Sequence, residues 1–147
     1  MRFGKALFLA TVLLSPAVLH SQQRRYVDPR TPGDTAVRPF SAAVLAGNTL
    51  YLSGKIGLGA DRRVPATPEE EARIVLDDVK STLYKAGMSM DDLVSVQVFC
   101  SDLSYYDAFN RVYRTYFTKE FPARAFIGSG PLLFKARFEI QAIAVKR

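Results

Sequence analysis

Two charged side chains stand out because each lies in a short run of small and apolar residues. Arg124 is the single charge of FPARAFIGSG, and Glu139 lies within the alternating run FEIQAIAV. Removing a guanidinium from water costs free energy unless it finds a partner. Arg124 is therefore either paired with an acid, for instance across a subunit interface, or kept for an anionic ligand. Taken by itself, Glu139 is expected to be a cross-strand charge partner of a cation, such as Arg137 or Lys135 of a neighbouring chain.

The scarcity of histidine and cysteine excludes most other chemistry. His20 is the only histidine and Cys100 the only cysteine. If His20 is removed with the start of the chain, nucleophilic triads and the usual zinc ligand sets have no members. The sequence has no glycine-rich phosphate-binding motif. Catalysis would rest on Asp, Glu, Lys, Arg, Tyr, Ser and backbone groups, and we expect neither a metal nor a cofactor. Cys100 is expected to be a small core residue.

The first residues have the order of a secretory signal peptide. A basic start, MRFGK, precedes an apolar run over residues 6–19 and then a polar segment. Pro16 interrupts this run, which is shorter than the ~20 residues of a membrane span, so an uncleaved anchor is the alternative and no stable membrane anchor is expected. Cleavage could follow Ala17 or fall near Ser21. We expect residues 1–21 to be a signal peptide and the protein to be exported, into a periplasm or outside the cell.

The rest of the chain divides into an arm and one domain. Residues 22–38 are polar and broken by prolines, which predicts a flexible arm or linker. Residues 39–147 are enough for one domain with a sizeable core. The formal charge of +6 falls to +4 without the two basic residues of the first segment. No block of five or more basic residues occurs, so we expect no nucleic-acid partner.

The hydrophobic pattern predicts two helices and five strands. Thr67 as N-cap, Pro68 and Glu70 mark the start of the clearest helix, and Gly87 marks its end. The other expected elements are two strands joined by a turn at Gly47-Asn48, a strand at 93–100, a helix at 104–117, and strands at 124–128 and 137–145. The order ββ-α-β-α-ββ predicts an α+β two-layer sandwich, a mixed sheet with both helices on one face.

The face of the sheet away from the helices is expected to meet a partner. Alternation along the last two strands predicts that Arg124, Phe126, Glu139 and Ile143 share this face. Such a face is too apolar for open water, and a contiguous apolar patch usually marks an interaction site. We therefore expect a homo-oligomer packed through it.

Residues 39–147 resemble the RidA/YjgF reactive-intermediate deaminase family along essentially the whole domain. The matching stretches, in chain order, are PFSAAVLAGNTLYLSGKIG, VLDDVKSTLYKAGMSMDDLVSVQVFCSDLSYYDAFNRVYRTYF, FPARAFI and FEIQAIAV. The resemblance implies a chorismate-mutase-like fold and a homotrimer with active sites in clefts between subunits. Members of the family hydrolyse 2-aminoacrylate and related enamines or imines of amino acids to 2-oxo acids and ammonia.

The resemblance also implies roles for seven residues. Arg124 matches the arginine of the family's P-A-R motif, which holds the substrate carboxylate. Glu139 matches the glutamate of the last strand, which positions or activates the attacking water. The substrate-binding residues that the resemblance implies are Ser53, Gly54, Phe40, Asn110 and Phe126.

The sequence departs from the family around these residues. A first-strand tyrosine of the family is Phe40 here, and a cysteine two places after the arginine is Phe126. Lys55 replaces the usual glutamine after Ser53-Gly54, and a proline expected between the last strands aligns with Leu133. The carboxylate anchor and the water-handling acid are kept while the pocket around them is altered, so the resemblance does not identify the substrate.

The expected function is hydrolytic deamination of reactive enamine or imine intermediates, with a small imino or 2-oxo acid as the ligand. One alternative is a non-catalytic trimer that binds small carboxylates or protects against stress. Another is an endoribonuclease or translation inhibitor, an activity associated with some family members. The modest charge and the scarcity of histidine count against that last alternative.

Overall fold

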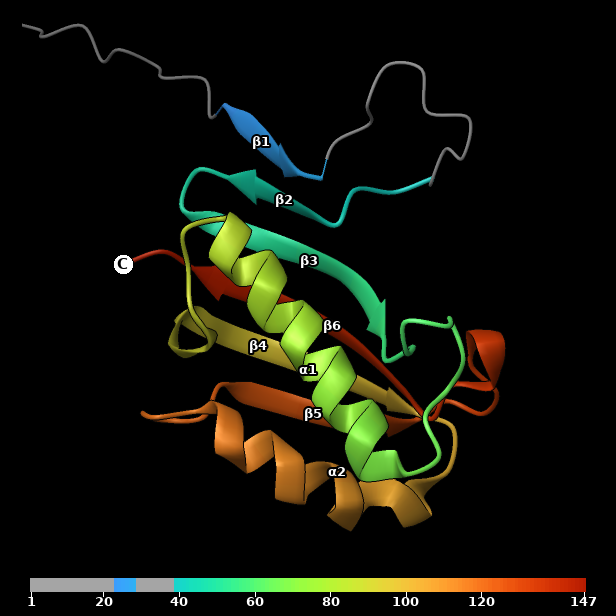
Figure 1. The fold of residues 1–147 in the computed structure, drawn as a ribbon. Coiled ribbons are helices and arrows are strands. Elements are labelled where there is room, and N and C mark those ends of the chain that lie inside the picture. Colours follow the sequence, from blue (N-terminus) through green and yellow to red (C-terminus); the bar gives the residue numbers. More distant parts are fainter. Residues whose placement is uncertain (1–22, 29–38) are drawn as a thin grey trace, which may run out of the picture.

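A six-stranded mixed sheet carries two helices on one of its faces (Figure 1). The structure, a computed structural model, describes residues 23–28 and 39–147. The strands are ordered β1-β2-β3-β6-β4-β5; β4 and β5 pair in parallel, and the other neighbours pair antiparallel. The predicted α+β class, with both helices on one face of a mixed sheet, is confirmed.

The elements follow one another as βββαβαββ. The strands are β1 (Arg24–Val27), β2 (Ala43–Ala46), β3 (Thr49–Ile56), β4 (Leu93–Cys100), β5 (Ala123–Gly128) and β6 (Phe138–Val145), and the helices are α1 (Pro68–Lys85) and α2 (Tyr106–Tyr113). The predicted helix at 104–117 is α-helical only in its middle, because short 3₁₀ turns at Leu103–Tyr105 and Arg114–Tyr116 flank it. α1 lies across the middle of the sheet, and α2 connects the parallel strands β4 and β5 (Figure 1).

Strand β1 lies within residues 22–38, the segment predicted to be a flexible arm or linker. All four of its residues pair antiparallel with β2. Arg25 Nη2 donates to the carbonyl of Ala86 at 2.9 Å, and Lys85 Nζ lies 2.8 Å from Asp28 Oδ2. Pairing therefore covers the outer edge of β2. The predicted signal peptide, 1–21, lies outside the described residues. No helix among those described is long and apolar enough to span a membrane.

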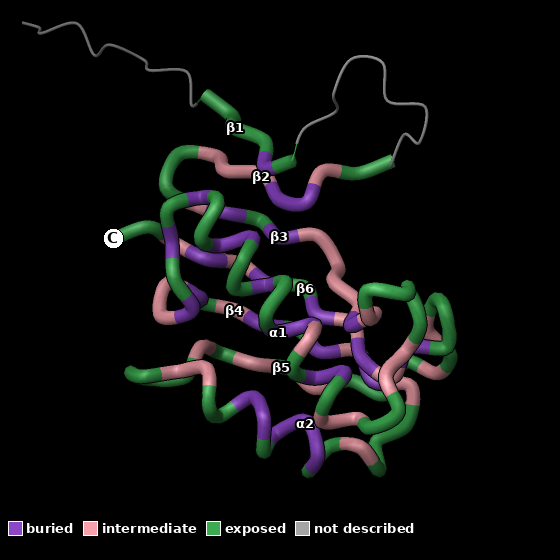
Figure 2. Tube along the Cα trace, viewed as in Figure 1, coloured by how far each residue is buried: buried purple, intermediate pink, exposed green. Residues whose placement is uncertain are grey.

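Helix α1 begins where the capping residues predict. The backbone N–H of Glu70 donates to Thr67 Oγ1 at 3.2 Å, and Pro68 occupies the first turn, where its missing N–H leaves nothing unsatisfied. The apolar stripe of α1 is buried against the sheet, and Figure 2 shows buried positions along both helices and the central strands. The fully buried side chains of this core include Val75, Leu76, Val79, Leu83, Leu50, Val98, Cys100, Phe109, Phe138 and Ile140.

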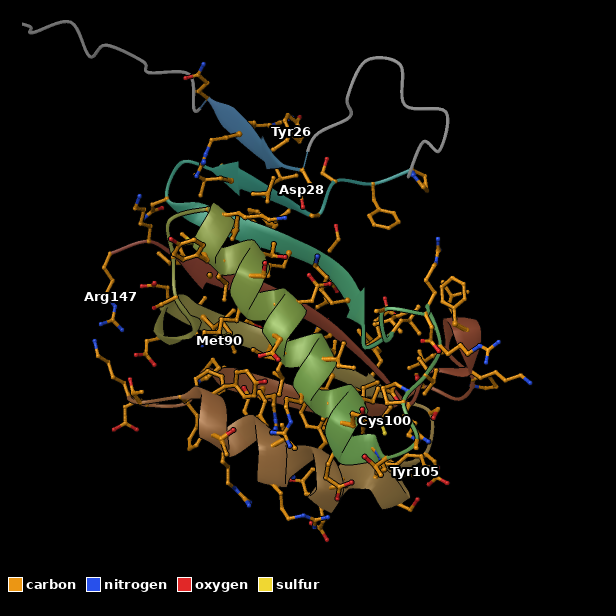
Figure 3. The ribbon with its side chains drawn as sticks, in the orientation of Figure 1. Tyr26, Asp28, Met90, Cys100, Tyr105 and Arg147 are labelled. Carbon is orange, nitrogen blue, oxygen red and sulfur yellow. The ribbon has the colours of Figure 1, made fainter. Side chains whose placement is uncertain are left out.

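A buried ion pair fastens the start of β6 to the start of α1. Glu71 is fully buried, and its carboxylate accepts from the backbone N–H groups of Arg137 at 2.6 Å and Phe138 at 3.1 Å and from Arg137 Nη1 at 2.8 Å. The guanidinium also lies over the ring of Tyr105, 5.6 Å from its centroid. Tyr105 and Cys100 lie near the same end of α1 (Figure 3). Carboxylate and guanidinium thus satisfy each other, which a buried pair needs.

The strand register corrects the predicted faces of the sheet. Residues paired across neighbouring strands point to the same side, and Arg124 and Phe126 pair with the buried residues Val96 and Val98. Both side chains therefore lie on the helix side, against α2, while Glu139 lies on the opposite side. The prediction that all of them share the open face is wrong. Alternation fixes which residues of one strand lie together, but it does not say which face of the sheet they take.

The open face keeps an apolar character without Arg124 and Phe126. It includes Tyr51 and Ile143, which pair with each other, and Phe99, which pairs with Glu139. Ile127 continues this row on the edge strand β5. Tyr51 and Ile127 are among the exposed large apolar residues of the described chain.

Candidate active site

A cavity of about 190 Å³ lies between α2 and the start of β5. Its lining residues are Tyr106, Asn110, Tyr113, Arg114, Phe121, Pro122 and Arg124. Helix α2 supplies the aromatic and amide side chains from positions three or four apart, which lie on one face of a helix. β5 supplies the guanidinium from the helix side of the sheet.

Aromatic rings hold the guanidinium of Arg124. Its central carbon lies 4.5 Å from the ring centroid of Tyr113 and 5.7 Å from that of Phe126. Nη1 is buried and has no hydrogen-bond acceptor among the described residues. None of the ion pairs in the described part of the chain includes Arg124. Cation–π contacts stabilise the charge, yet they leave its in-plane N–H donors without partners.

A second cavity, of about 310 Å³, lies on the open face of the sheet. Its lining residues are Gly54, Phe99, Leu132, Glu139 and Gln141. A Cβ atom at Gly54 would overlap Oε1 of Glu139, so the glycine provides the space in which this carboxylate lies. The register of β3 against β6 shifts between Leu52 and Lys55, which places Gly54 in an irregular stretch beside Glu139.

The two cavities carry complementary chemistry on opposite faces of one sheet. The Arg124 cavity offers a half-buried cation with unused donors, which suits a carboxylate. The Glu139 cavity offers an acid beside open space, which suits the positioning of water. Within one chain, neither cavity contains both groups. Arg124 and Asn110 share the first cavity, and Gly54 and Glu139 share the second.

The remaining predicted substrate-binding residues lie outside both cavities. The hydroxyl of Ser53 donates to the carbonyl of Ser41 at 2.6 Å, so it fastens β3 to the segment before β2. Phe40, next to Ser41, is 56% exposed. Phe126 packs edge-on against Tyr106, with ring centroids 5.0 Å apart, and forms part of the support of Arg124.

Two aromatic residues of α2 that the sequence does not single out, Tyr106 and Tyr113, line the Arg124 cavity. Tyr106 and Tyr113 point into this cavity together with Phe121, and the rings of Tyr113 and Phe121 stack with centroids 6.2 Å apart. The sequence does show that Tyr106, Asn110 and Tyr113 are three or four residues apart and therefore share one face of the helix. Spacing alone does not separate a core face from the wall of a cavity.

Burial sets the ionisation of two groups. It raises the pKa of the Tyr113 hydroxyl to about 12, against a smaller lowering by the nearby charge of Arg124. Burial also raises the pKa of the Cys100 thiol, whose Sγ lies 3.0 Å from the carbonyl of Asp102. A buried neutral thiol fits the predicted core role. Among the described residues, no cluster of three or more His, Cys, Asp or Glu could hold a metal ion.

Comparison with known proteins finds one family along nearly the whole domain. The family model described as Endoribonuclease L-PSP matches residues 32–146. A 2-iminobutanoate/2-iminopropanoate deaminase of Capra hircus is 37% identical over 76% of this chain and 82% of its own length. The RutC family protein UK114 of Drosophila melanogaster is 37% identical over 74% of this chain and 80% of its own length.

Solved structures agree with these sequence matches. The crystal structure of the Escherichia coli YjgF gene product superposes with a TM-score of 0.72 at 35% identity, over 76% of this chain and 91% of that one. Escherichia coli TdcF with bound serine superposes with a TM-score of 0.74 at 28% identity, over 84% of this chain and 100% of that one. Sequence and fold together place this chain in the YjgF/RidA family.

Proposed function

We propose that this protein hydrolyses enamine and imine forms of small amino acids to 2-oxo acids and ammonia. The observation that carries the proposal is the Arg124 cavity, in which a cation has no acid partner among the described residues. Several relatives with this fold are named as deaminases of 2-iminobutanoate and 2-iminopropanoate, both of which are small imino acids. Each of these compounds carries the carboxylate that such a cation can bind.

Arg124 would anchor the substrate through its carboxylate. A planar guanidinium forms two parallel hydrogen bonds with a carboxylate, and the half-buried position on β5 strengthens them. The Tyr113 ring, 4.5 Å from the central carbon of the guanidinium, would help to hold the cation in place. The TdcF structure, solved with bound serine, shows that a relative of this fold binds an amino acid.

Glu139 would direct a water molecule to the imine carbon. An enamine first takes a proton at carbon and becomes the imine. The water oxygen then forms a bond to the imine carbon while the carboxylate takes one of its protons, and the C=N double bond becomes a single bond as the nitrogen gains a proton. After a second protonation the nitrogen leaves as ammonia while the hydroxyl loses its proton. The carbon ends as the carbonyl of the 2-oxo acid, so oxidation states are unchanged and no cofactor is needed. The absence of a Cβ atom at Gly54 supports this role, because it leaves space beside the carboxylate.

The complete site would form between two copies of the chain. Arg124 and Glu139 lie on opposite faces of the sheet, so one copy cannot bring them to the same substrate. The open face is apolar at Tyr51, Phe99 and Ile143, which fits contact with another copy. In a homotrimer, the Arg124 cavity of each chain would meet the open face of the next chain. Three such contacts would form a closed ring.

Export is the location that the start of the sequence favours. The basic and apolar order of residues 1–21 supports a signal peptide. N-terminal sequencing of the protein purified from its own cells tests this: a mature chain that begins near residue 18 or 22 is expected. A chain that still begins at Met1 in the cytoplasmic fraction contradicts it.

A binder without turnover is the second candidate, and the Phe126 side chain favours it. This ring packs against Phe109, with ring centroids 5.5 Å apart, and against Tyr106, which lines the Arg124 cavity. Lys55 stands where the family has a glutamine, but it lines neither cavity, and its ammonium pairs with Asp78 at 3.2 Å. A cavity beside a phenylalanine, where the family has the smaller cysteine, could hold a carboxylate without admitting the water that hydrolysis needs.

The deciding experiment measures 2-oxo acid release from freshly generated imino acids. An amino-acid oxidase supplies the imine, and the rate above spontaneous hydrolysis is compared among wild type, Arg124→Ala and Glu139→Gln. If the protein is a deaminase, both variants should lose most of the rate above spontaneous hydrolysis. Arg124→Ala should also lose affinity for the 2-oxo acid product. Saturable binding of 2-oxo acids without any enhancement selects the binder. Equal enhancement by wild type and Arg124→Ala contradicts both.

A further inference from the structure

We propose that Tyr113 is a second ligand-contacting residue of the Arg124 cavity, whose hydroxyl donates a hydrogen bond to the same acid group that Arg124 binds. The identity of that acid as an imino or 2-oxo acid rests on the proposed function. The placement of the donor rests on the contacts of Tyr113 itself.

The hydroxyl of Tyr113 is buried without a partner. The residue is 4% exposed, and its Oη has no hydrogen-bond partner among the described residues. An unsatisfied buried hydroxyl lowers stability, and native proteins rarely keep one without a functional reason. Tyr113 lies at the end of α2, where its ring stacks against Phe109 and Phe121 and cannot turn the hydroxyl to water.

The second unsatisfied buried side-chain atom of the described residues belongs to a residue that lines the same cavity. It is Nη1 of Arg124, and the guanidinium sits over the Tyr113 ring. Both groups are donors: arginine has no acceptor, and the tyrosine hydroxyl keeps its proton at neutral pH, since even its ordinary pKa lies well above neutrality and burial raises that pKa further, to about 12. Two donors that converge on one cavity, without a facing carboxylate, select a ligand with negatively charged oxygens.

A neighbouring tyrosine shows how this chain satisfies a hydroxyl that has only a structural role. Tyr116 lies one helical turn after Tyr113, and its Oη is 2.8 Å from Asp77 Oδ1 and 3.1 Å from the carbonyl of Arg73. These contacts connect the end of α2 to α1. Tyr116 does not line the Arg124 cavity. The pair of tyrosines therefore provides a matched test, since one phenylalanine substitution removes a free hydroxyl and the other a bonded one.

The test compares Tyr113→Phe and Tyr116→Phe with wild type in two measurements on the purified protein. The first is the dissociation constant for 2-oxobutanoate by titration calorimetry, together with KM for the matching imine. The second is the thermal midpoint of unfolding without ligand, at one protein concentration. Tyr113→Phe is expected to weaken binding by ~10- to 100-fold, because it removes a hydrogen bond to a charged group. Its midpoint should stay equal or rise, since no internal hydrogen bond is lost.

The control should behave in the opposite way. Tyr116→Phe is expected to lower the midpoint and to leave binding unchanged. If Tyr113→Phe binds as tightly as wild type, or loses stability as Tyr116→Phe does, Tyr113 is a structural residue and the inference is wrong. If wild type binds 2-oxobutanoate but releases no product from imines, the proposed deaminase fails while the role of Tyr113 is still decided by binding. If wild type binds no 2-oxo acid, both fail.

Discussion

Arg137 and Arg124 both lie against a tyrosine ring, but among the described residues only Arg137 has acceptors for its charge. Arg137 donates to Glu71 Oε2 at 2.8 Å and to the carbonyls of Pro65 at 2.9 Å and Ala66 at 3.1 Å. Arg124 contacts aromatic rings, and its buried Nη1 has no acceptor among the described residues. The aromatic support is similar; the difference is the set of acceptors.

The two glutamates that belong to this comparison differ in the same way. Glu71 is fully buried and accepts three hydrogen bonds from Arg137 and Phe138, so it holds two elements together. Glu139 lies beside a cavity, and none of the ion pairs of the described chain includes it. A satisfied pair stabilises the fold, whereas an arginine and an acid kept apart on opposite faces remain available for ligands. This contrast predicts stability effects at one set and functional effects at the other.

Glu71→Ala should have the largest effect on stability. It leaves the Arg137 guanidinium and two backbone N–H groups without their acceptor, and breaking one side of a buried pair lowers the free energy of unfolding by about 3–5 kcal/mol. Urea unfolding at fixed protein concentration measures the loss. Glu71→Gln is the matched control, because it keeps an acceptor oxygen and loses the charge, and it should lose less. A loss below about 1 kcal/mol for Glu71→Ala contradicts the structural assignment of this pair.

The sequence predicts the architecture well because local signals suffice for it. Thr67, Pro68 and Glu70 locate the start of α1, and alternation locates β4 and β6. Strand β1 is not predicted, because its four residues, RRYV, lie in a polar segment and are too few to show an alternation of apolar and polar residues. Only its pairing with β2 makes it a strand.

The candidate site is less predictable, because it depends on register. A motif match singles out Arg124 and Glu139, but the sequence places them on one face, while their pairing with Val96 and Phe99 places them on opposite faces. The spacing of Tyr113 on its helix indicates where its ring lies, but it does not indicate that the hydroxyl has no partner among the described residues. Period and propensity describe which residues lie together on an element; they do not describe which polar atoms remain without partners.

Gly54→Ala sharpens the comparison at the other acid, with an intermediate effect on function. The added Cβ would overlap Oε1 of Glu139, and this flexible carboxylate can move away at little cost to the fold. The displaced carboxylate would no longer face the proposed position of the attacking water, so imine turnover should fall by about tenfold or more. The free energy of unfolding should be nearly unchanged. Steady-state assays and urea unfolding measure the two quantities.

Gly59→Ala is the control for Gly54→Ala. Its Cβ would also meet a carboxylate oxygen, Oδ1 of Asp61 at 3.0 Å, but in a loop outside both cavities. It should leave turnover unchanged. If Gly54→Ala retains wild-type turnover, the position of the Glu139 carboxylate has no role in the reaction.

Arg124→Met should have the smallest effect on stability, and this distinguishes the two arginines most directly. Methionine fills much of the same volume against Tyr113 and Phe126 and removes a half-buried charge that has no acid partner among the described residues. The free energy of unfolding should therefore change by less than about 1 kcal/mol, or rise. Saturating 2-oxobutanoate should raise the thermal midpoint of wild type and not that of the variant, because only the bound state is stabilised by a ligand. A large loss of stability without ligand would place Arg124 in the same structural class as Arg137, since a cation that is kept for a ligand contributes little to the fold in its absence.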